Sequence, residues 1–399
     1  MTEPFARAGA LNDTRVIELG QLIAGPFCGQ LFADHGADVI KVEAPDQGDP
    51  LRTWGRGDIP TWWAVAARNK RCVTADMRKP EGRDIVLRLV EQADVLIENF
   101  RPGTLEKWGL GYDALKACNP RIVLVRVSGY GQTGPYSPRA GYASVGEAMG
   151  GMRYLCGEPD RPPSRAGLSL GDTLAASFAF MGALMALKER DRSGVGQVVD
   201  SAIYEAVLAV MEATIPEYTV NGEIRGRSGA KLAGIAPSNV YPCADGAILI
   251  AANQDSVFDR FCTAIGRTEW IKDPRFIDHR ARGAHQDLLD DLIGAWTQSR
   301  TMAEVEALMT ESGVPAGRVN RAPEMLADPH FAARQSIVDV AHPMIANLKM
   351  QNVFPRLSRT PGEVAWPGPA LGAHNSEVYG ALLGADEKQL AAWRAAKVI

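Results

Sequence analysis

Short apolar runs alternate with amphipathic stretches through the first third of the chain. The amphipathic stretches 25–35 and 80–93 space their apolar residues at helical intervals and carry charges between them. The apolar runs predict strands at Arg15–Leu19, Ala37–Glu43, Arg71–Ala75, Asp94–Glu98 and Arg121–Ser128. Because short strands separated by helices pair in parallel through right-handed crossovers, the pattern predicts an α/β fold.

The pattern changes twice further along the chain. Residues 129–172 are rich in glycine and proline and read as a long loop, followed by an apolar helix over Thr173–Arg190. Composition shifts again near 221–234, so we expect a linker over 206–224. After it come a strand pair around Val240–Ala251, turning at Asp245-Gly246, and helices to about 311. These elements predict a smaller α+β domain over about 225–320.

Composition narrows the function classes. The chain has 399 residues, 43 basic and 47 acidic, and 46% are hydrophobic, which excludes a disordered protein. The mildly acidic balance gives no general attraction to nucleic acid or to anionic lipid. The start carries no secretory signal pattern, and the longest apolar stretch, Leu174–Leu187, is shorter than a bilayer span. Six scattered cysteines indicate a reduced, cytoplasmic protein, and the histidines show no metal-ligand spacing.

The stretch from Gly129 to Gly134 matches the G-x-G-x-x-G pattern of dinucleotide-binding turns. That function requires a helix to open inside the motif, whereas Pro135 and Pro138 come directly after it here. No acidic residue ends a following strand about 20 residues on. The glycines therefore favour a loop beside a ligand over an NAD site.

Basic residues gather near two strand ends. Arg68 to Arg71 precede the third predicted strand, and Asn99-Phe100-Arg101 come after the fourth, with Lys107 beyond. Each cluster taken alone is typical of solvated surface charge. Together they could hold phosphate groups and an adenine ring.

Asp172 stands between a glycine and the long apolar helix. One interpretation is an N-cap that accepts a backbone N–H. The other is a carboxylate nucleophile, kept ionised by the helix dipole, with Gly171 leaving room for a substrate. The residues alone leave both interpretations open.

Seven segments in family order resemble the class III CoA-transferases, the family of formyl-CoA transferase and carnitine CoA-transferase. They are AGPFCGQLFADHGADVIKVEAP (24–45), RNKRCVTADMRKPEG (68–82), DVLIENFRPG (94–103), GYGQTGP (129–135), GLSLGD (167–172), GVPAGRVN (313–320) and LGAH (371–374). The resemblance implies a Rossmann-like large domain built from both chain ends, here 1–205 and 321–399. It also implies two interlocked subunits, so we expect a homodimer.

The resemblance further implies the chemistry. The family's catalytic aspartate falls on Asp172, which would carry CoA from an acyl-CoA to a small carboxylic acid through covalent intermediates, with no metal or redox cofactor. The implied CoA contacts are Gln21, Leu22, Ala24, Lys70, Asn99, Phe100, Arg101 and Lys107. Where some relatives have an arginine this chain has Ala44, so Arg68, Arg71 or Arg101 is expected to supply that phosphate contact.

Two departures bear on the substrate. The glycine run of formyl-CoA transferase is replaced by SGAKLAGIAPSNVY (228–241), which favours a dicarboxylate or hydroxy acid over oxalate or formate, met by Arg139, Lys231 or Asn239. The related α-methylacyl-CoA racemases carry Gly-His-Asp where this chain has Gly141-Tyr142-Ala143, so a racemase would lack one of its two bases. A non-catalytic CoA-binding protein is the remaining alternative, and an assay of CoA exchange separates it from a transferase.

Overall fold

The structure is a computed structural model that describes residues 8–56 and 60–399. Most of the N-terminal stretch inspected for a secretory signal lies outside the described residues. The chain divides into two compact units: unit 1 comprises Met1–Met152, Ala166–Ile215 and His330–Ile399, and unit 2 comprises Arg153–Arg165 and Pro216–Pro329. Unit 1 thus combines the N-terminal and C-terminal parts of the described chain.

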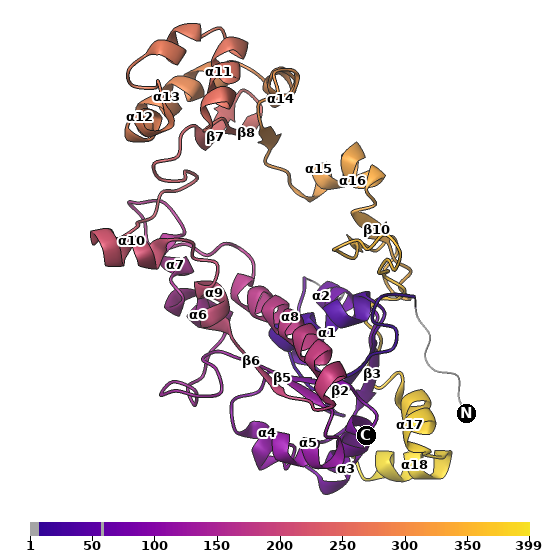
Figure 1. Ribbon diagram of the computed structural model, residues 1–399. Helices are drawn as coiled ribbons and strands as arrows, with labels where there is room; N and C mark the ends of the chain where they lie inside the picture. The colour runs from indigo at the N-terminus through magenta and orange to yellow at the C-terminus, as the bar shows by residue number, and fades with distance from the viewer. Residues whose placement is uncertain (1–7, 57–59) are drawn as a thin grey trace. The chain divides into compact units, whose positions relative to one another are not determined.

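A parallel six-stranded sheet forms the centre of unit 1 (Figure 1). Its strands are β1 Arg15–Glu18, β2 Asp38–Glu43, β3 Arg71–Thr74, β4 Val95–Glu98, β5 Val123–Ser128 and β6 Val198–Ala202. Their order is β3-β2-β1-β4-β5-β6, and every neighbouring pair is parallel. The mixed α/β fold with a parallel sheet is confirmed, and the strand order is that of doubly wound nucleotide-binding sheets.

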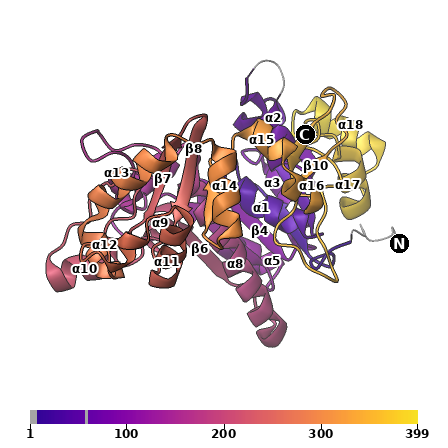
Figure 2. The same cartoon turned by 90° about the horizontal axis from the view of Figure 1, so that it is seen from above.

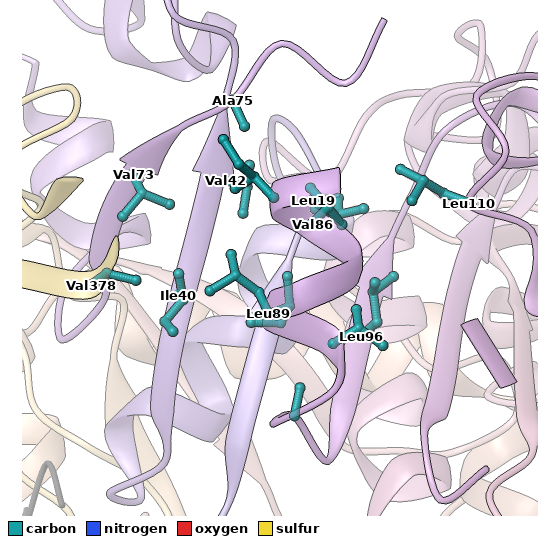
Figure 3. Close-up of a cluster of buried hydrophobic side chains, with 14 of the residues drawn as sticks. Leu19, Ile40, Val42, Val73, Ala75, Val86, Leu89, Leu96, Leu110 and Val378 are labelled. Carbon is teal, nitrogen blue, oxygen red and sulfur yellow. The ribbon is translucent and has the colours of Figure 1, made fainter. Parts of the chain in front are cut away.

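Helices cover both faces of this sheet. One face is covered by α1 Ala24–Asp34 and α8 Leu170–Ser193, and the other by α3 Pro80–Val90, α4 Thr104–Lys107, α5 Tyr112–Cys118, α17 Asn375–Leu383 and α18 Glu387–Ala395. Figures 1 and 2 both show the C-terminal helices α17 and α18 beside α3. Alternation along the strands divides the apolar residues between the two layers, so Val16 and Val39 face α1 while Ile17 and Ile40 face α3. Figure 3 shows the second layer, with Leu89 of α3 among Ile40, Val42 and Leu96.

The remaining elements of unit 1 are short. They are η1 Pro50–Thr53, α2 Thr61–Ala66, α6 Ala143–Met149, α7 Met152–Leu155, α9 Ile203–Leu208, α16 Pro329–Ala333, β10 Ile337–Asp339 and β11 Lys349–Gln351, with α7 and α16 at unit boundaries. The prediction of one uninterrupted loop over 129–172 is wrong, because α6 and α7 form within it. The segment expected to be a linker, 206–224, holds the end of α9 and all of α10 Thr214–Asn221.

Helix α8 is, within the described ranges, the one helix long and apolar enough by length and composition to cross a membrane. Its alanines Ala175, Ala176, Ala179 and Ala183 are fully buried in the core layer that α8 shares with α1 and the sheet. Small side chains let the helix lie close to the strands. On this side α8 therefore packs as part of the core of unit 1.

Unit 2 has its own antiparallel sheet and core. The strands β7 Ser238–Cys243, β8 Gly246–Ala251 and β9 Ala316–Arg318 pair in sequence order, and the expected hairpin turn at Asp245-Gly246 is confirmed. Around it lie α11 Asp255–Ala264, η2 Thr268–Lys272, α12 His279–Ala284, α13 Gln286–Thr297, α14 Met302–Glu311 and α15 Ala322–Ala327. Phe258, Phe261 and Phe276 fill the core.

Candidate active site

The strand order of unit 1 reverses direction between β1 and β4. From β1 the chain first adds β2 and β3 on one side, and then returns to place β4 on the other side. In doubly wound sheets, ligands bind outside the carboxyl ends of the strands at this switch point. The segments that leave the sheet there begin with Leu19 and Asn99, so topology brings the implied CoA contacts Gln21, Leu22 and Ala24 to the same edge as Asn99.

Asn99 fixes the turn between β1 and α1. Its Oδ1 accepts a hydrogen bond from the Gln21 backbone N–H at 2.7 Å, and its Nδ2 donates to the Gln21 carbonyl at 2.8 Å. A Cβ on Gly20 would lie 3.0 Å from Asn99 Oδ1, and one on Gly25 would lie 3.2 Å from Asn99 Cγ. Two glycines therefore make room for the Asn99 amide, and the turn is held from the neighbouring strand.

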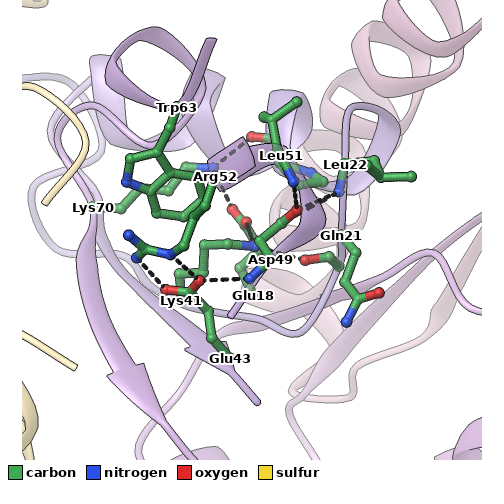
Figure 4. A network of polar contacts seen from close by, with 12 residues as sticks. Glu18, Gln21, Leu22, Lys41, Glu43, Asp49, Leu51, Arg52, Trp63 and Lys70 are labelled. Atoms are coloured by element: carbon green, nitrogen blue, oxygen red, sulfur yellow. Dashed lines mark hydrogen bonds and ion pairs between the residues drawn. The ribbon is translucent and has the colours of Figure 1, made fainter. Parts of the chain in front are cut away.

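Groups on the same edge remain available to a ligand. The Gln21 side chain extends away from the buried polar network (Figure 4). Arg101 and Lys107 are exposed, and within the described ranges their side chains form no hydrogen bond or ion pair. Phe100 is half-buried, with its ring packed edge-on against Trp108 at a centroid distance of 5.0 Å. A half-buried amide and two unpaired cations suit an anionic ligand.

The other basic cluster lies elsewhere. Arg68 pairs with Asp34 at 2.6 Å and Arg71 with Asp38 at 2.7 Å, near the amino ends of the strands, and both arginines are buried. The expectation that two basic clusters converge is wrong, because in a parallel sheet the start of β3 and the end of β4 lie at opposite edges. Of the three arginines considered for the contact missing at Ala44, Arg101 alone is exposed at the carboxyl edge.

Lys70 is also removed from any surface. Its side chain is 0% exposed, and its Nζ lies 2.7 Å from Glu18 Oε2 and 2.7 Å from the Pro26 carbonyl. Burial lowers the pKa of Lys70. The ammonium of Lys70 is thus engaged with Glu18 and with the first turn of α1.

Asp172 lies in the first turn of α8, which begins at Leu170 with Ser169 as the N-cap residue. The interpretation of Asp172 as an N-cap is therefore wrong, because the helix starts earlier than the apolar pattern indicated. Since α8 runs back from the carboxyl edge to the start of β6, its first turn lies at the same edge as the start of α1. The helix dipole favours a carboxylate at this position.

Glycines bring three helices close together at Asp172. A Cβ on Gly171 would lie 3.0 Å from Ile203 of α9 and 3.1 Å from the Ala143 carbonyl of α6. Glu147 of α6 is 2% exposed, and its Oε1 accepts a hydrogen bond from the Gly171 N–H at 3.3 Å. Glu147 is absent from the sequence-predicted residues because its segment was assigned to loop, although ASVGEAM has the composition of a short helix.

The glycine-rich motif after β5 forms an irregular loop. No helix opens between residues 129 and 142, so the expectation that this motif forms a loop is confirmed. The Gln132 N–H donates to Asp200 Oδ2 at 2.9 Å, and Arg139 stacks on Tyr136 with its Cζ 3.6 Å from the ring centroid. The structure places Arg139 on an exposed loop of unit 1.

The two unit 2 residues expected to meet the acid are engaged within unit 2. Lys231 Nζ lies 2.6 Å from Asp287 Oδ1, and Asn239 Nδ2 donates to Asp290 Oδ2 at 3.0 Å. Burial raises the pKa of Asp290 despite donation from Tyr241. Across residues 8–56 and 60–399, no cluster of three or more His, Cys, Asp or Glu side chains is arranged to hold a metal ion.

Comparison with known proteins gives the class. Residues 11–375 match the family described as CoA-transferase family III, and the chain belongs to that family. The predicted enzyme class, a family III CoA-transferase, is thereby confirmed.

Individual relatives agree with this assignment. The chain is 58% identical over 98% of both chains to the succinyl-CoA–D-citramalate CoA-transferase of Chloroflexus aurantiacus. It is 35% identical to the succinate–glutarate CoA-transferase of Agrobacterium fabrum, over 96% of this chain and 98% of that one. A crystal structure of a CAIB/BAIF family protein from Brucella suis superposes with a TM-score of 0.84 at 35% identity, covering 94% of this chain and 100% of that chain.

Proposed function

We propose that this enzyme transfers CoA from succinyl-CoA to a small dicarboxylic or hydroxy acid of the citramalate type. The observation that carries the proposal is the 58% identity, over 98% of both chains, to an enzyme named for succinyl-CoA and D-citramalate. Relatives named for L-malate and for glutarate have the same chemical class of acid, with two carboxylates on a short carbon chain.

Asp172 is the nucleophile of the proposed reaction. Its carboxylate attacks the succinyl-CoA thioester, expelling the CoA thiolate and forming an aspartyl–succinyl mixed anhydride. The thiolate attacks the aspartyl carbonyl, which releases succinate and leaves CoA as a thioester on Asp172. The acceptor carboxylate then displaces the thiolate to give a second anhydride, and the thiolate attacks its acceptor carbonyl, regenerating Asp172. No proton is gained or lost overall, and one difficult exchange becomes four easier steps.

Acyl-CoA binding is assigned to the carboxyl edge at the switch point. Gln21, Leu22 and Ala24 belong to the turn and helix start after β1, and Arg101 and Lys107 supply unpaired positive charge for the phosphates. Phe100 offers part of an aromatic face. Asn99 acts at least through the backbone of Gln21, and Lys70, whose Nζ pairs with Glu18, acts through the start of α1.

We also propose that the enzyme works as a homodimer with an interface well above the standard size of ~1,600 Å². Supporting this, α8 exposes Phe178, Met181 and Met185, at 37%, 44% and 68%. Apolar side chains gathered along one helix are typical of surfaces that a partner covers. Light scattering at micromolar concentration tests this, and a monomer would contradict it.

An exchange panel tests the proposed function. Purified enzyme is incubated with succinyl-CoA and one acceptor acid per reaction. The acceptors are citramalate, malate, glutarate, mesaconate, oxalate and formate, and new thioesters are identified by mass spectrometry. We expect the CoA thioester of a dicarboxylic or hydroxydicarboxylic acid, with one succinate released for each thioester formed. Transfer only to formate or oxalate would contradict the assigned acid class. Tight CoA binding without any exchange would favour the non-catalytic alternative.

A further inference from the structure

Leu22 adopts a backbone conformation that side chains rarely accept. Its φ is 63°, in the left-handed region, which is unfavourable for an L-residue because Cβ crowds the following carbonyl oxygen. Such residues persist only where the surroundings hold them, and they gather at functional sites. Leu22 sits in the turn at the switch point, one residue after the free Gln21 side chain.

The group that holds Leu22 is Asp49, which is 1% exposed. Asp49 Oδ1 accepts from the Leu22 N–H at 3.0 Å and from the Leu51 N–H at 2.9 Å, and its Oδ2 lies 2.9 Å from Lys41 Nζ. A Cβ on the preceding Gly48 would lie 2.8 Å from Arg52 Cδ. Glycine at that position leaves room for the Arg52 side chain, and Figure 4 shows Asp49 with its dashed contacts to Leu22 and Leu51.

Two buried lysines, Lys41 and Lys70, complete a charged network around the Leu22 turn. We call this network, with its carboxylates Glu18 and Asp49, the frame. Lys41 Nζ donates to the Gly20 carbonyl at 2.7 Å and pairs with Glu18 Oε1 at 3.0 Å. Glu18 in turn pairs with Lys70, whose Nζ reaches the Pro26 carbonyl. The two carboxylates of this frame balance its two ammonium groups. Burial alone would raise the pKa of Asp49, but Lys41 and the donated N–H groups hold it below its ordinary value.

Such a frame exceeds what a surface turn needs for folding. Asn99 already fixes Gln21, and the neighbouring carbonyls of Gly20 and Pro26 are bound separately. What Asp49 adds is the direction of the peptide N–H at Leu22, and hence the course of the chain into α1. A turn set before the ligand arrives lowers the entropic cost of binding.

We propose that Asp49 is a positioning residue that holds Leu22 in the left-handed conformation and thereby presents the Gln21 turn to acyl-CoA. The inference rests on the proposed function, because it assumes that this turn binds acyl-CoA. Asp49 itself touches no substrate. Its loss is expected to weaken binding of acyl-CoA more than it slows the bound enzyme.

The test uses Asp49→Asn alone and combined with Leu22→Gly or Leu22→Ala. Asp49→Asn is expected to raise KM for succinyl-CoA about tenfold and to lower kcat less than threefold. About tenfold is the change in affinity that corresponds to the entropic cost of ordering the backbone of one residue. Glycine adopts positive φ without steric cost. Leu22→Gly should therefore recover most of the lost KM in the Asp49→Asn background, whereas Leu22→Ala, which keeps a Cβ, should not.

Two outcomes would overturn the proposal: an unchanged KM in folded Asp49→Asn, or equal rescue by alanine and glycine. If Asp49→Asn does not fold, Leu22→Pro tests the same idea without touching the buried charges, because proline fixes φ near −65° and has no N–H. An unchanged KM in Leu22→Pro would likewise contradict the proposal. Failure of the proposed function itself would look different, since wild-type enzyme would then transfer CoA to none of the acids.

Discussion

Replacing Asn99 by alanine tests whether the turn after β1 serves acyl-CoA binding. The change removes the two hydrogen bonds to Gln21, at 2.7 and 2.8 Å. At about 1 kcal/mol each, the free energy of unfolding should fall by about 2 kcal/mol. Freeing the backbone of one residue in the unliganded enzyme adds about 1–2 kcal/mol to the cost of binding. KM for succinyl-CoA should therefore rise by about tenfold, since 1.4 kcal/mol is a factor of ten.

Asn119 provides the matched control. It is also half-buried, and its Nδ2 donates to the carbonyls of Val90 and Ala93 at 2.9 and 2.8 Å, at the opposite edge of the sheet, while its Oδ1 accepts from the Arg121 N–H at 3.0 Å. Asn119→Ala should therefore lose at least as much free energy of unfolding as Asn99→Ala, measured by urea denaturation, yet keep the wild-type KM. Steady-state kinetics with both variants decides the matter. Equal KM values for Asn99→Ala and Asn119→Ala would show that the hydrogen bonds of Asn99 serve stability alone and not acyl-CoA binding.

The same geometry makes three further predictions. Glu147→Gln keeps an acceptor for the Gly171 N–H, so its kcat should stay within about threefold of wild type, whereas Glu147→Leu, which removes this acceptor from a buried N–H, should lose at least tenfold in kcat and some stability. Arg101→Ala should raise KM for succinyl-CoA, most strongly at low salt, while Arg121→Ala, an exposed arginine at the opposite edge, should not. Because the pKa of Asp49 is depressed below its ordinary 3.8, its stabilisation is present above pH 3.8 and is lost as pH falls further. The difference in unfolding free energy between wild type and Asp49→Asn, measured by denaturation at several pH values, should therefore shrink below pH 3.8, and a constant difference would contradict this prediction. An unchanged kcat in Glu147→Leu would contradict the first prediction, and equal KM values in the two arginine variants would contradict the second.

Five of the six strands of the parallel sheet were predictable because they are short apolar runs, whereas β6, Val198–Ala202, is partly exposed and was not predicted as a strand. Val95–Glu98, for example, is completely buried, and its apolar residues alternate between the two helix layers. Helix α6 was not predictable in the same way. It exists because Gly146 and Gly150 let α9 approach, where a Cβ would lie 2.4 Å from Ile203 and 2.6 Å from Val207. In the sequence alone, Gly146 and Gly150 are typical of a loop. Their role in the packing of α6 against α9 appears only in the folded structure.

The candidate site divides along similar lines. Asp172 and Asn99 belong to recognisable patterns, a glycine before a helix and a polar residue after a strand. The sequence already implied that Arg68 and Arg71 lie at the opposite edge, because they precede the third strand, Asn99 follows the fourth, and the strands pair in parallel. The sequence could not show that Lys70 pairs with Glu18, 52 positions earlier in the chain, because β2 lies between β1 and β3 and the contact depends on tertiary packing.

In the proposed reaction Asp172 carries first the acyl group and then CoA. The direct measurement is trapping with hydroxylamine during turnover of succinyl-CoA and then peptide mass analysis, with Asp172→Asn as the control. Asparagine has a helix propensity similar to that of aspartate, and losing the charge at the helix start costs only about 0.3–1 kcal/mol, so the variant should fold. We expect a hydroxamate on the wild-type Asp172 peptide alone, and none in the variant, whose CoA exchange should fall by several orders of magnitude. A label on another residue, or full exchange by Asp172→Asn, would contradict the account.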